Sequence, residues 1–330
     1  MAAQVLILAH TDVERLLPMA ECIELMGAAL AALARGEAYQ PLRMIVRPPG
    51  AAGVMALMPA YKAVPGPAYG LKAIGVFPGN PEKGKDAHQG TVMLFSGETG
   101  ELLAMMNASA VTAIRTAAVS GVATRLLARE DAGDLAVLGA GVQARTHLEA
   151  MSCVRQLRRV RVASRRVEHA RAMADEASRR YTLPVEAVDS AEAAVRGADL
   201  IVTATSSPEP VLRREWIAPG AHLNVVGASM ATSREVDTAT MAAARLFVDR
   251  RESTLNEAGD YLLAARDGAI GPGHIVAELG ELLTGAAAGR RSPDEITLFK
   301  SLGLAVEDLA SAERVYRNAQ AAGAGTRVAF

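Results

Sequence analysis

Aromatic residues, cysteine and excess charge are all scarce in this chain. Only 4% of the 330 residues are aromatic, and the formal net charge at pH 7 is −1. The sequence has no basic stripe with interleaved aromatics, so we expect no nucleic-acid partner. The two cysteines, Cys22 and Cys153, have neither the spacing of a disulfide framework nor that of a metal site, which fits a reducing, cytoplasmic location.

Long apolar runs and metal-binding patterns are missing as well. No stretch of ~18 apolar residues occurs, and the first residues do not combine a charged region with an apolar one, so we expect no membrane span and no export. The six histidines are scattered without an H-x-x-x-H pair, which predicts no catalytic metal. By contrast, 50% of the residues are hydrophobic, and 330 residues are enough for about two domains with a sizeable core.

The most informative segment is a glycine-rich turn between a strand and a helix. Residues 135–138 form an apolar run typical of a buried parallel strand, and helix-forming sequence covers 145–151. The turn reads Gly-Ala-Gly-Val-Gln-Ala, the G-x-G-x-x-A form of the dinucleotide fingerprint. The first glycine permits a tight turn, the second lets the backbone approach a pyrophosphate, and the last alanine allows close helix packing. The predicted cofactor contacts are Gly139, Gly141, Val142, Gln143 and Ala144.

The end of the next candidate strand bears on the choice of cofactor. Folds that bind NAD place an Asp or Glu about 20 residues after the glycines, where it holds the ribose 2′-hydroxyl. This sequence has Ser164-Arg165-Arg166 instead, whose hydroxyl and guanidinium groups can bind a 2′-phosphate. We therefore predict NADP(H) in preference to NAD(H). The alternative is that the two arginines only begin a solvated helix.

From residue 129 onward, candidate strands alternate with helices. The candidate strands are residues 135–138, 160–163, 184–188, 200–204, 222–226 and 245–249. This alternation predicts an α/β fold with a doubly wound parallel sheet of the Rossmann type. Ligands of such sheets bind at the carboxyl ends of the strands, so we place Thr203, Ala204 and Thr205 at the cofactor. A plain polar loop would have the same composition.

The remaining segments predict a second, α+β domain. Helical periods cover residues 12–35, 109–128 and 304–322, and short β runs split by Pro and Gly fill residues 40–105. A polar segment after residue 128 marks a domain boundary. Residues 292–301 are left open, because their first four resemble a helix N-cap box and the rest alternate like a strand.

Six segments spread along the chain together resemble one family, the ornithine cyclodeaminase/μ-crystallin family. They are residues 70–80, 112–118, 139–145, 223–229, 257–260 and 297–308, and they follow the family's order. The resemblance implies that residues 1–128 with 305–330 form a substrate-binding and dimerisation domain, and that 129–304 form the dinucleotide-binding domain. It also implies a homodimer, and it adds Val226, Gly227 and Gly303 to the predicted cofactor contacts.

By resemblance, Arg43, Lys72 and Arg115 are the catalytic and substrate-binding set, with both arginines clamping a substrate carboxylate. Lys72 is one of only five lysines and lies in an apolar strand. Burial there would lower its pKa and let it exchange protons with a substrate nitrogen near neutrality. From the residues alone, the alternatives are an exposed edge-strand lysine and, for the arginines, a surface or salt-bridge role. Asp308 matches a segment near the nicotinamide, or it only complements the dipole of the last helix.

One position separates the activities of this family. Its cyclodeaminases and some of its alanine dehydrogenases carry an Asp where this chain has Ser229, and a Ser cannot act as a general base without a partner. We therefore predict an NAD(P)H-dependent reductase of imino acids, such as pyrroline-2-carboxylate and piperideine-2-carboxylate, with Ser229 at the substrate. The alternatives are an alanine-type amino-acid dehydrogenase, an ornithine cyclodeaminase, and a non-catalytic protein that binds NADPH or a small ligand. Met44, Met58 and Met230 are the expected pocket walls.

Overall fold

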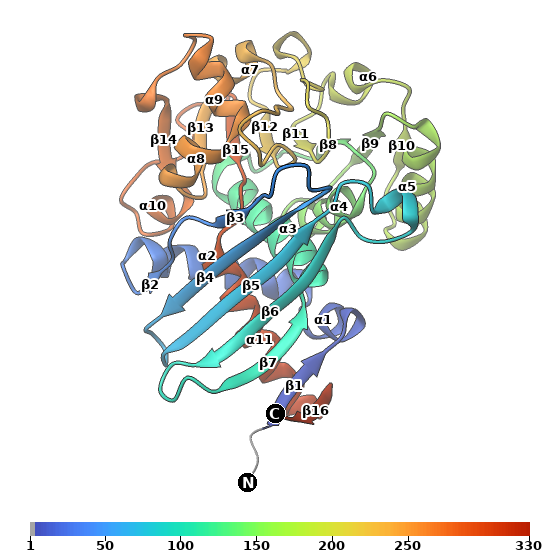
Figure 1. The fold of residues 1–330 in the computed structure, drawn as a ribbon. Coiled ribbons are helices and arrows are strands. Elements are labelled where there is room, and N and C mark those ends of the chain that lie inside the picture. Colours follow the sequence, from blue (N-terminus) through green and yellow to red (C-terminus); the bar gives the residue numbers. More distant parts are fainter. Residues whose placement is uncertain (1–3) are drawn as a thin grey trace. The chain divides into compact units, whose positions relative to one another are not determined.

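The computed structural model describes residues 4–330, except for the side chain of Pro81. These residues form two compact units (Figure 1). Unit 1 runs to Arg115 and resumes at Gly303, whereas unit 2 is the continuous segment Thr116–Leu302. The first boundary falls inside helix α3 (Ala108–Leu127), upstream of the boundary expected after residue 128.

Unit 1 is built on an eight-stranded, largely antiparallel sheet. Its strands are β1 (Gln4–Leu8), β2 (Ala38–Tyr39), β3 (Met44–Val46), β4 (Val54–Lys62), β5 (Ala68–Val76), β6 (His88–Ser96), β7 (Leu102–Asn107) and β16 (Thr326–Ala329). Their order is β16-β1-β7-β6-β5-β4-β2, with β3 paired to β4. The β1–β7 pair is parallel, and the β4–β5, β5–β6 and β6–β7 pairs are antiparallel. The predicted run of short strands is thus one continuous sheet.

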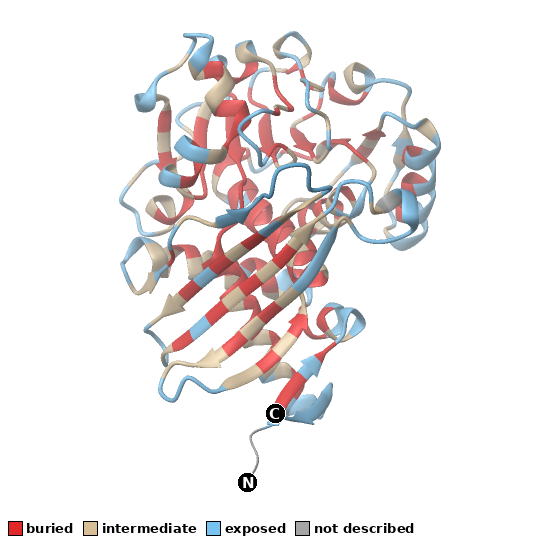
Figure 2. Ribbon diagram, in the orientation of Figure 1, coloured by how far each residue is buried: buried red, intermediate tan, exposed pale blue. Residues whose placement is uncertain are grey.

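Helix α11 (Ala305–Ala322) covers one face of this sheet, and α2 (Met19–Ala34) packs on α11. Helix α11 is the last helix and packs against β4, β5 and β6, and Figure 1 shows it lying across the strands. Buried residues alternate with more exposed ones along β4 and β5 (Figure 2), as a sheet with one covered face requires. Two short helices, α1 (His10–Leu16) and η1 (Pro81–Lys83), also belong to this unit.

The helical period over residues 12–35 forms two helices rather than one. Leu17 has the non-helical angles φ −130° and ψ 71°, and Pro18, which has no N–H to continue the first helix, is the N-cap of α2. Within residues 4–330, no single helix is long and apolar enough to cross a membrane; α1 and α2 pass on length and composition only as a pair bent by 81°.

Unit 2 contains an eight-stranded parallel sheet. Its strands are β8 (Asp134–Leu138), β9 (Arg159–Ala163), β10 (Val185–Ala187), β11 (Leu200–Thr203), β12 (His222–Val225), β13 (Arg245–Val248), β14 (Ile275–Glu278) and β15 (Thr297–Lys300). The order is β10-β9-β8-β11-β12-β15-β13-β14, and all seven neighbouring pairs are parallel. The strand order reverses between β8 and β11, which is the point where doubly wound sheets bind ligands. The predicted fold class is confirmed.

Helices connect the strands of unit 2 in the expected alternation. They are α4 (Val142–Val154), α5 (Val167–Arg180), α6 (Ala191–Val195), α7 (Thr238–Ala243), α8 (Arg251–Glu257), α9 (Gly259–Arg266), α10 (Leu279–Leu283), η2 (Arg214–Trp216) and η3 (Pro272–His274). All six predicted strands are present. The segment that the sequence left open contains the interior strand β15, whose four residues are buried between β12 and β13. The four residues before Ile296 form a turn rather than a helix.

Candidate functional site

The glycine-rich turn joins β8 to α4. Gly139 adopts φ 118°, and a Cβ added there would lie 2.4 Å from the carbonyl oxygen of Ala204, so only glycine fits. Gly141 is the N-cap of α4, and a Cβ added there would meet no atom within 4 Å. Ala144 is completely buried, as close packing of the helix demands. The turn therefore leaves an open cradle at Gly141, directly before the start of a helix.

This cradle fits the phosphates of a dinucleotide. The first N–H groups of an α-helix lack intrahelical partners and carry partial positive charge, which favours a bound pyrophosphate. Val142, in the first turn of α4, is 59% exposed, so the helix start is not covered within unit 2. The predicted residues from Gly139 to Ala144 lie together in this one turn at the strand-order reversal.

The predicted 2′-phosphate residues follow β9. Arg166 is the N-cap of α5, and the Ser164 hydroxyl donates to the Arg166 carbonyl oxygen at 2.7 Å. Arg165 and Arg166 are both exposed, and neither guanidinium forms an ion pair with residues 4–330. The turn places two cations and no carboxylate at the end of the second strand.

Other predicted cofactor residues lie at the carboxyl ends of β11 and β12. Thr203 is fully buried, and its hydroxyl donates to Glu235 Oε2 at 2.8 Å, so this side chain is bound inside unit 2. Thr205 offers its backbone N–H to the same carboxylate, and Gly227 does so too. The sequence did not point to Glu235, because it lies 8 positions after Gly227, too far along the chain to replace the acid absent at Ser229. The Ala204 N–H donates to Leu138 O, and the Val226 N–H to Thr203 O.

Ser229 belongs to the loop after β12. Its side chain is exposed, and its N–H donates to Gly227 O at 3.2 Å. It lies in unit 2, whereas Arg43, Lys72 and Arg115 lie in unit 1. Of the expected pocket walls, Met44 and Met230 are 61% and 49% exposed, and Met58 is buried.

Lys72 lies in the middle of β5, on the sheet face that α11 covers. Its Nζ is 2.7 Å from Asp308 Oδ2, and the two side chains are 2% and 1% exposed. Because β5 pairs with both β4 and β6, the alternative of an exposed edge-strand lysine is wrong. Asp308 is thus the direct partner of Lys72, a role that its position in the first turn of α11 did not reveal.

Arg115 lies beside this pair. Its Nε donates to Asp308 Oδ1 at 3.0 Å, and its Nη1 donates to Glu307 Oε2 at 2.8 Å. Gly303 makes the close approach of this guanidinium feasible, because it adopts φ 80° and a Cβ there would lie 2.3 Å from Arg115 Nη1. Since Arg115 is only 3% exposed, a surface role is wrong for it, whereas its ion pairs with Glu307 and Asp308 agree with the salt-bridge alternative.

Arg43 reaches the same glycine from the segment before β3. Its Nη2 donates to Gly303 O at 3.0 Å, and the residue is partly exposed. The three predicted cations are therefore brought together within unit 1, with Asp308 and Glu307 among them. Gly303, predicted as a cofactor contact, lies between the two arginines.

Burial is the largest influence on Lys72. The pKa of Lys72 is lowered from 10.5 to about 8: burial contributes most, the positive charge of Arg115 acts in the same direction, and Asp308 opposes the shift. The ammonium is therefore protonated at neutral pH but can release its proton just above it. Such a group is suited to proton exchange with a substrate nitrogen.

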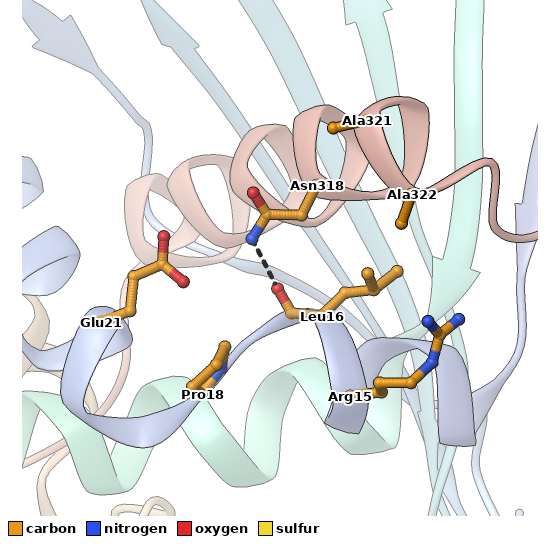
Figure 3. A pocket seen from close by; sticks show the side chains of 7 residues that line it. All are labelled: Arg15, Leu16, Pro18, Glu21, Asn318, Ala321 and Ala322. Atoms are coloured by element: carbon orange, nitrogen blue, oxygen red, sulfur yellow. Dashed lines mark hydrogen bonds between the residues drawn. The ribbon is translucent and has the colours of Figure 1, made fainter.

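A separate surface pocket of about 390 Å³ in unit 1 is lined by Arg15, Leu16, Pro18, Glu21, Asn318, Ala321 and Ala322 (Figure 3). Asn318 Nδ2 donates across the pocket to Leu16 O at 2.8 Å, so the Asn318 side chain links α11 to the end of α1.

Within residues 4–330, no group of three or more His, Cys, Asp or Glu side chains has the arrangement of a metal site.

Comparison with known proteins agrees with this geometry. The family model of the ornithine cyclodeaminase/mu-crystallin family matches residues 3–323. The ketimine reductase mu-crystallin of Mus musculus is 41% identical over 294 residues, covering 88% of this chain and 90% of the mouse protein.

Two solved structures extend the similarity to the fold. The Δ1-pyrroline-2-carboxylate reductase of Thermococcus litoralis, in complex with NADH and L-proline, has a TM-score of 0.96 at 38% identity, covering 98% of this chain and 100% of that one. An archaeal alanine dehydrogenase dimer with bound NAD has a TM-score of 0.93 at 33% identity, covering 99% and 100%. The chain belongs to the ornithine cyclodeaminase/mu-crystallin family.

Proposed function

We propose that this protein is a nicotinamide-dependent reductase that converts imino acids to amino acids. The observation that carries the proposal is the buried Lys72, held by Asp308 beside two arginines. An imino acid presents a carboxylate next to a C=N bond, and these are the groups that such a cluster can bind and protonate. The ketimine and pyrroline-2-carboxylate reductases among the relatives act on this class of substrate.

The charges of the cluster suit a single carboxylate. Lys72, Arg43 and Arg115 supply three cations, and Asp308 and Glu307 supply two anions, which leaves one net positive charge. Arg43 is the more exposed arginine, so we assign it the principal contact to the substrate carboxylate. Arg115, held by two carboxylates, would contribute a fixed positive field and orient Asp308.

A bound nicotinamide cofactor would supply the hydride for the imine carbon. Lys72 would hold the proton at the imine nitrogen, because a protonated C=N bond accepts hydride more readily than a neutral one. Asp308 would keep the Lys72 ammonium in place and partly offset the effect of burial on its pKa. The charged residues of unit 1 thus bind, orient and protonate the substrate.

We infer further that NADP(H) is preferred over NAD(H). Support comes from Ser164, Arg165 and Arg166 at the end of β9, where the two guanidinium groups are exposed and no acidic residue is present to bind a 2′-hydroxyl. A 2′-phosphate with two negative charges suits this turn.

The experiment that tests the function is oxidation of NADPH, and in parallel NADH, by the purified protein. We would offer piperideine-2-carboxylate, pyrroline-2-carboxylate, and pyruvate with ammonia. Fast turnover of a cyclic imine is expected. Turnover only with pyruvate and ammonia would instead make the protein an alanine-type dehydrogenase, and tight NADPH binding without any turnover would favour a binding protein.

Ornithine cyclodeamination has less support in the structure. The loop after β12 carries Ser229 where a cyclodeaminase of the family has an acid. Glu235 cannot replace that acid, because both of its carboxylate oxygens accept hydrogen bonds inside unit 2. Release of ammonia from ornithine without net cofactor turnover would overturn this ranking.

We infer a homodimer that forms through the uncovered face of the unit 1 sheet. This face carries Met55 and Tyr69, each 50% exposed, with the Tyr61 ring 4.7 Å from that of Tyr69. A second copy is the occupant we propose, because the archaeal alanine dehydrogenase is itself a dimer. Light scattering is expected to give the mass of two chains, and Met55→Glu with Tyr69→Lys to give one. A wild-type monomer would overturn the inference.

A further inference from the structure

Glu235 joins the ends of two neighbouring strands in unit 2. It lies in the loop after β12 and is completely buried. Its Oε2 accepts from the Thr203 hydroxyl at 2.8 Å and from the Gly227 N–H at 2.6 Å, and its Oε1 accepts from the Thr205 N–H at 2.6 Å. One side chain thereby fixes the loops that leave β11 and β12 at their carboxyl ends.

A second buried ion pair supports Glu235. Asp260 Oδ1 accepts from the backbone N–H of Glu235 at 2.7 Å, and Asp260 Oδ2 lies 2.9 Å from Lys300 Nζ. Lys300 is the last residue of β15, which pairs with β12. The chain of contacts from Glu235 through Asp260 to Lys300 therefore spans the ends of three adjacent strands, β11, β12 and β15.

The loops are packed too tightly to tolerate a change in this arrangement. A Cβ on Gly227 would lie 2.1 Å from Thr205 O and 2.6 Å from the Glu235 carboxylate. Burial raises the pKa of Glu235, whereas the charge of Lys300 lowers it. The carboxylate accepts from three donors of these loops at once, which neither an apolar side chain nor an amide could do. It stands at the edge of a doubly wound sheet where ligands bind.

We infer that Glu235 is a positioning residue for the cofactor: it holds the loops after β11 and β12 in place at the sheet edge where the dinucleotide would bind. This inference rests on the proposed function. It also changes the role of Thr203, whose hydroxyl serves Glu235 rather than the cofactor.

The test compares Glu235→Gln with a matched control, Asp199→Asn. Asp199 directly precedes β11, at the opposite end of the same strand, and its Oδ2 accepts the N–H groups of Gly133 and Asp134 at 3.0 and 3.1 Å. We would measure the Kd of NADPH by fluorescence titration, the KM of the imine at saturating cofactor, and Tm. The Gln side chain leaves one or more buried donors unpaired, so we expect the NADPH Kd to rise at least ~10-fold. The imine KM should change little.

The control separates positioning from stability. Asp199→Asn should lower Tm without changing the NADPH Kd. Equal NADPH affinity in Glu235→Gln and wild type, in a wild type that reduces imines, would overturn the inference while leaving the proposed function standing. A wild type that neither binds a nicotinamide cofactor nor reduces imines would instead refute the proposed function. If Glu235→Gln does not fold, Thr203→Val serves as the second variant, because it removes only the hydroxyl that donates to Glu235. Thr203→Val should weaken NADPH binding measurably. Unchanged NADPH affinity in this variant would overturn the inference.

Discussion

The carboxylate of Asp308 lies 2.7 Å from the ammonium nitrogen of Lys72, and its other oxygen lies 3.0 Å from Arg115 Nε. One acid from the last helix thus neutralises charge on two cations from earlier parts of unit 1. Removing either cation would leave the acid less compensated, and removing the acid would leave two buried cations facing each other. Burial is the largest influence on the pKa of Lys72, and Asp308 is the group that opposes it.

Replacing Lys72 by Met should abolish most imine reduction. The variant removes the ammonium that we propose holds the proton at the imine nitrogen, and general acid catalysis of this kind contributes ~10²–10⁴-fold to kcat. NADPH affinity should stay close to the wild-type value. Lys62→Met is the matched control, because Lys62 Nζ forms a 2.8 Å ion pair with Glu313 of the same helix α11. Retention of most of kcat in Lys72→Met would refute the assigned role.

The pH dependence of imine reduction should report the Lys72 pKa. Lys72 has a pKa of about 8 and must be protonated to donate, so kcat/KM should fall as pH rises through about 8. Asp308 raises this pKa, so Asp308→Asn should move the fall to lower pH. Glu313→Gln, on the same helix, should leave it in place. A fall that does not move in Asp308→Asn would assign the ionisation to another group.

Replacing Arg165 and Arg166 by Ser should weaken NADPH binding selectively. A charged hydrogen bond to a phosphate contributes ~1.5–3 kcal/mol, so loss of one such contact should raise the NADPH KM ~10- to 100-fold and change the NADH KM little. Arg180→Ser is the control, since Arg180 lies on α5 and pairs with Glu149 at 2.9 Å. If both cofactors lose affinity equally, the arginines do not read the 2′-phosphate.

Gly141→Val should separate cofactor binding from folding. Gly141 has φ −86°, which any residue adopts, and an added Cβ would meet no protein atom within 4 Å. Tm should therefore change little in the absence of cofactor, while the side chain would occupy the cradle and reduce NADPH affinity at least ~10-fold. Calorimetry with and without NADPH measures both effects. An unchanged NADPH-induced rise in Tm would exclude this turn as the phosphate site.

Local sequence patterns were sufficient to predict six strands of unit 2, because buried parallel strands appear in a sequence as short apolar runs between helices. They were insufficient for β15. There, the turn before Ile296 has the composition of a helix start, and the segment after it is a strand because it pairs with both β12 and β13. The helical period over residues 12–35 likewise hid the break at Pro18, since the apolar spacing continues on both sides of it.

The cations of the candidate site could be found from the sequence, and their partners could not. Lys72 stands out in an apolar strand, but its contact with Asp308 joins residues more than two hundred positions apart in the chain. For Thr203, the position at a strand end could be predicted, but the direction of the side chain could not: its hydroxyl donates to Glu235. Side-chain direction and long-range pairing follow from tertiary packing, which a linear pattern does not contain.

Helix α11 supplies both acids that accompany Lys72 and Arg115, and it follows the whole of unit 2 in the chain. During translation, Lys72 and Arg115 are therefore synthesised long before their two counter-ions, with the whole of unit 2 between them. A nascent chain that has not yet reached α11 therefore cannot form this cluster of charges.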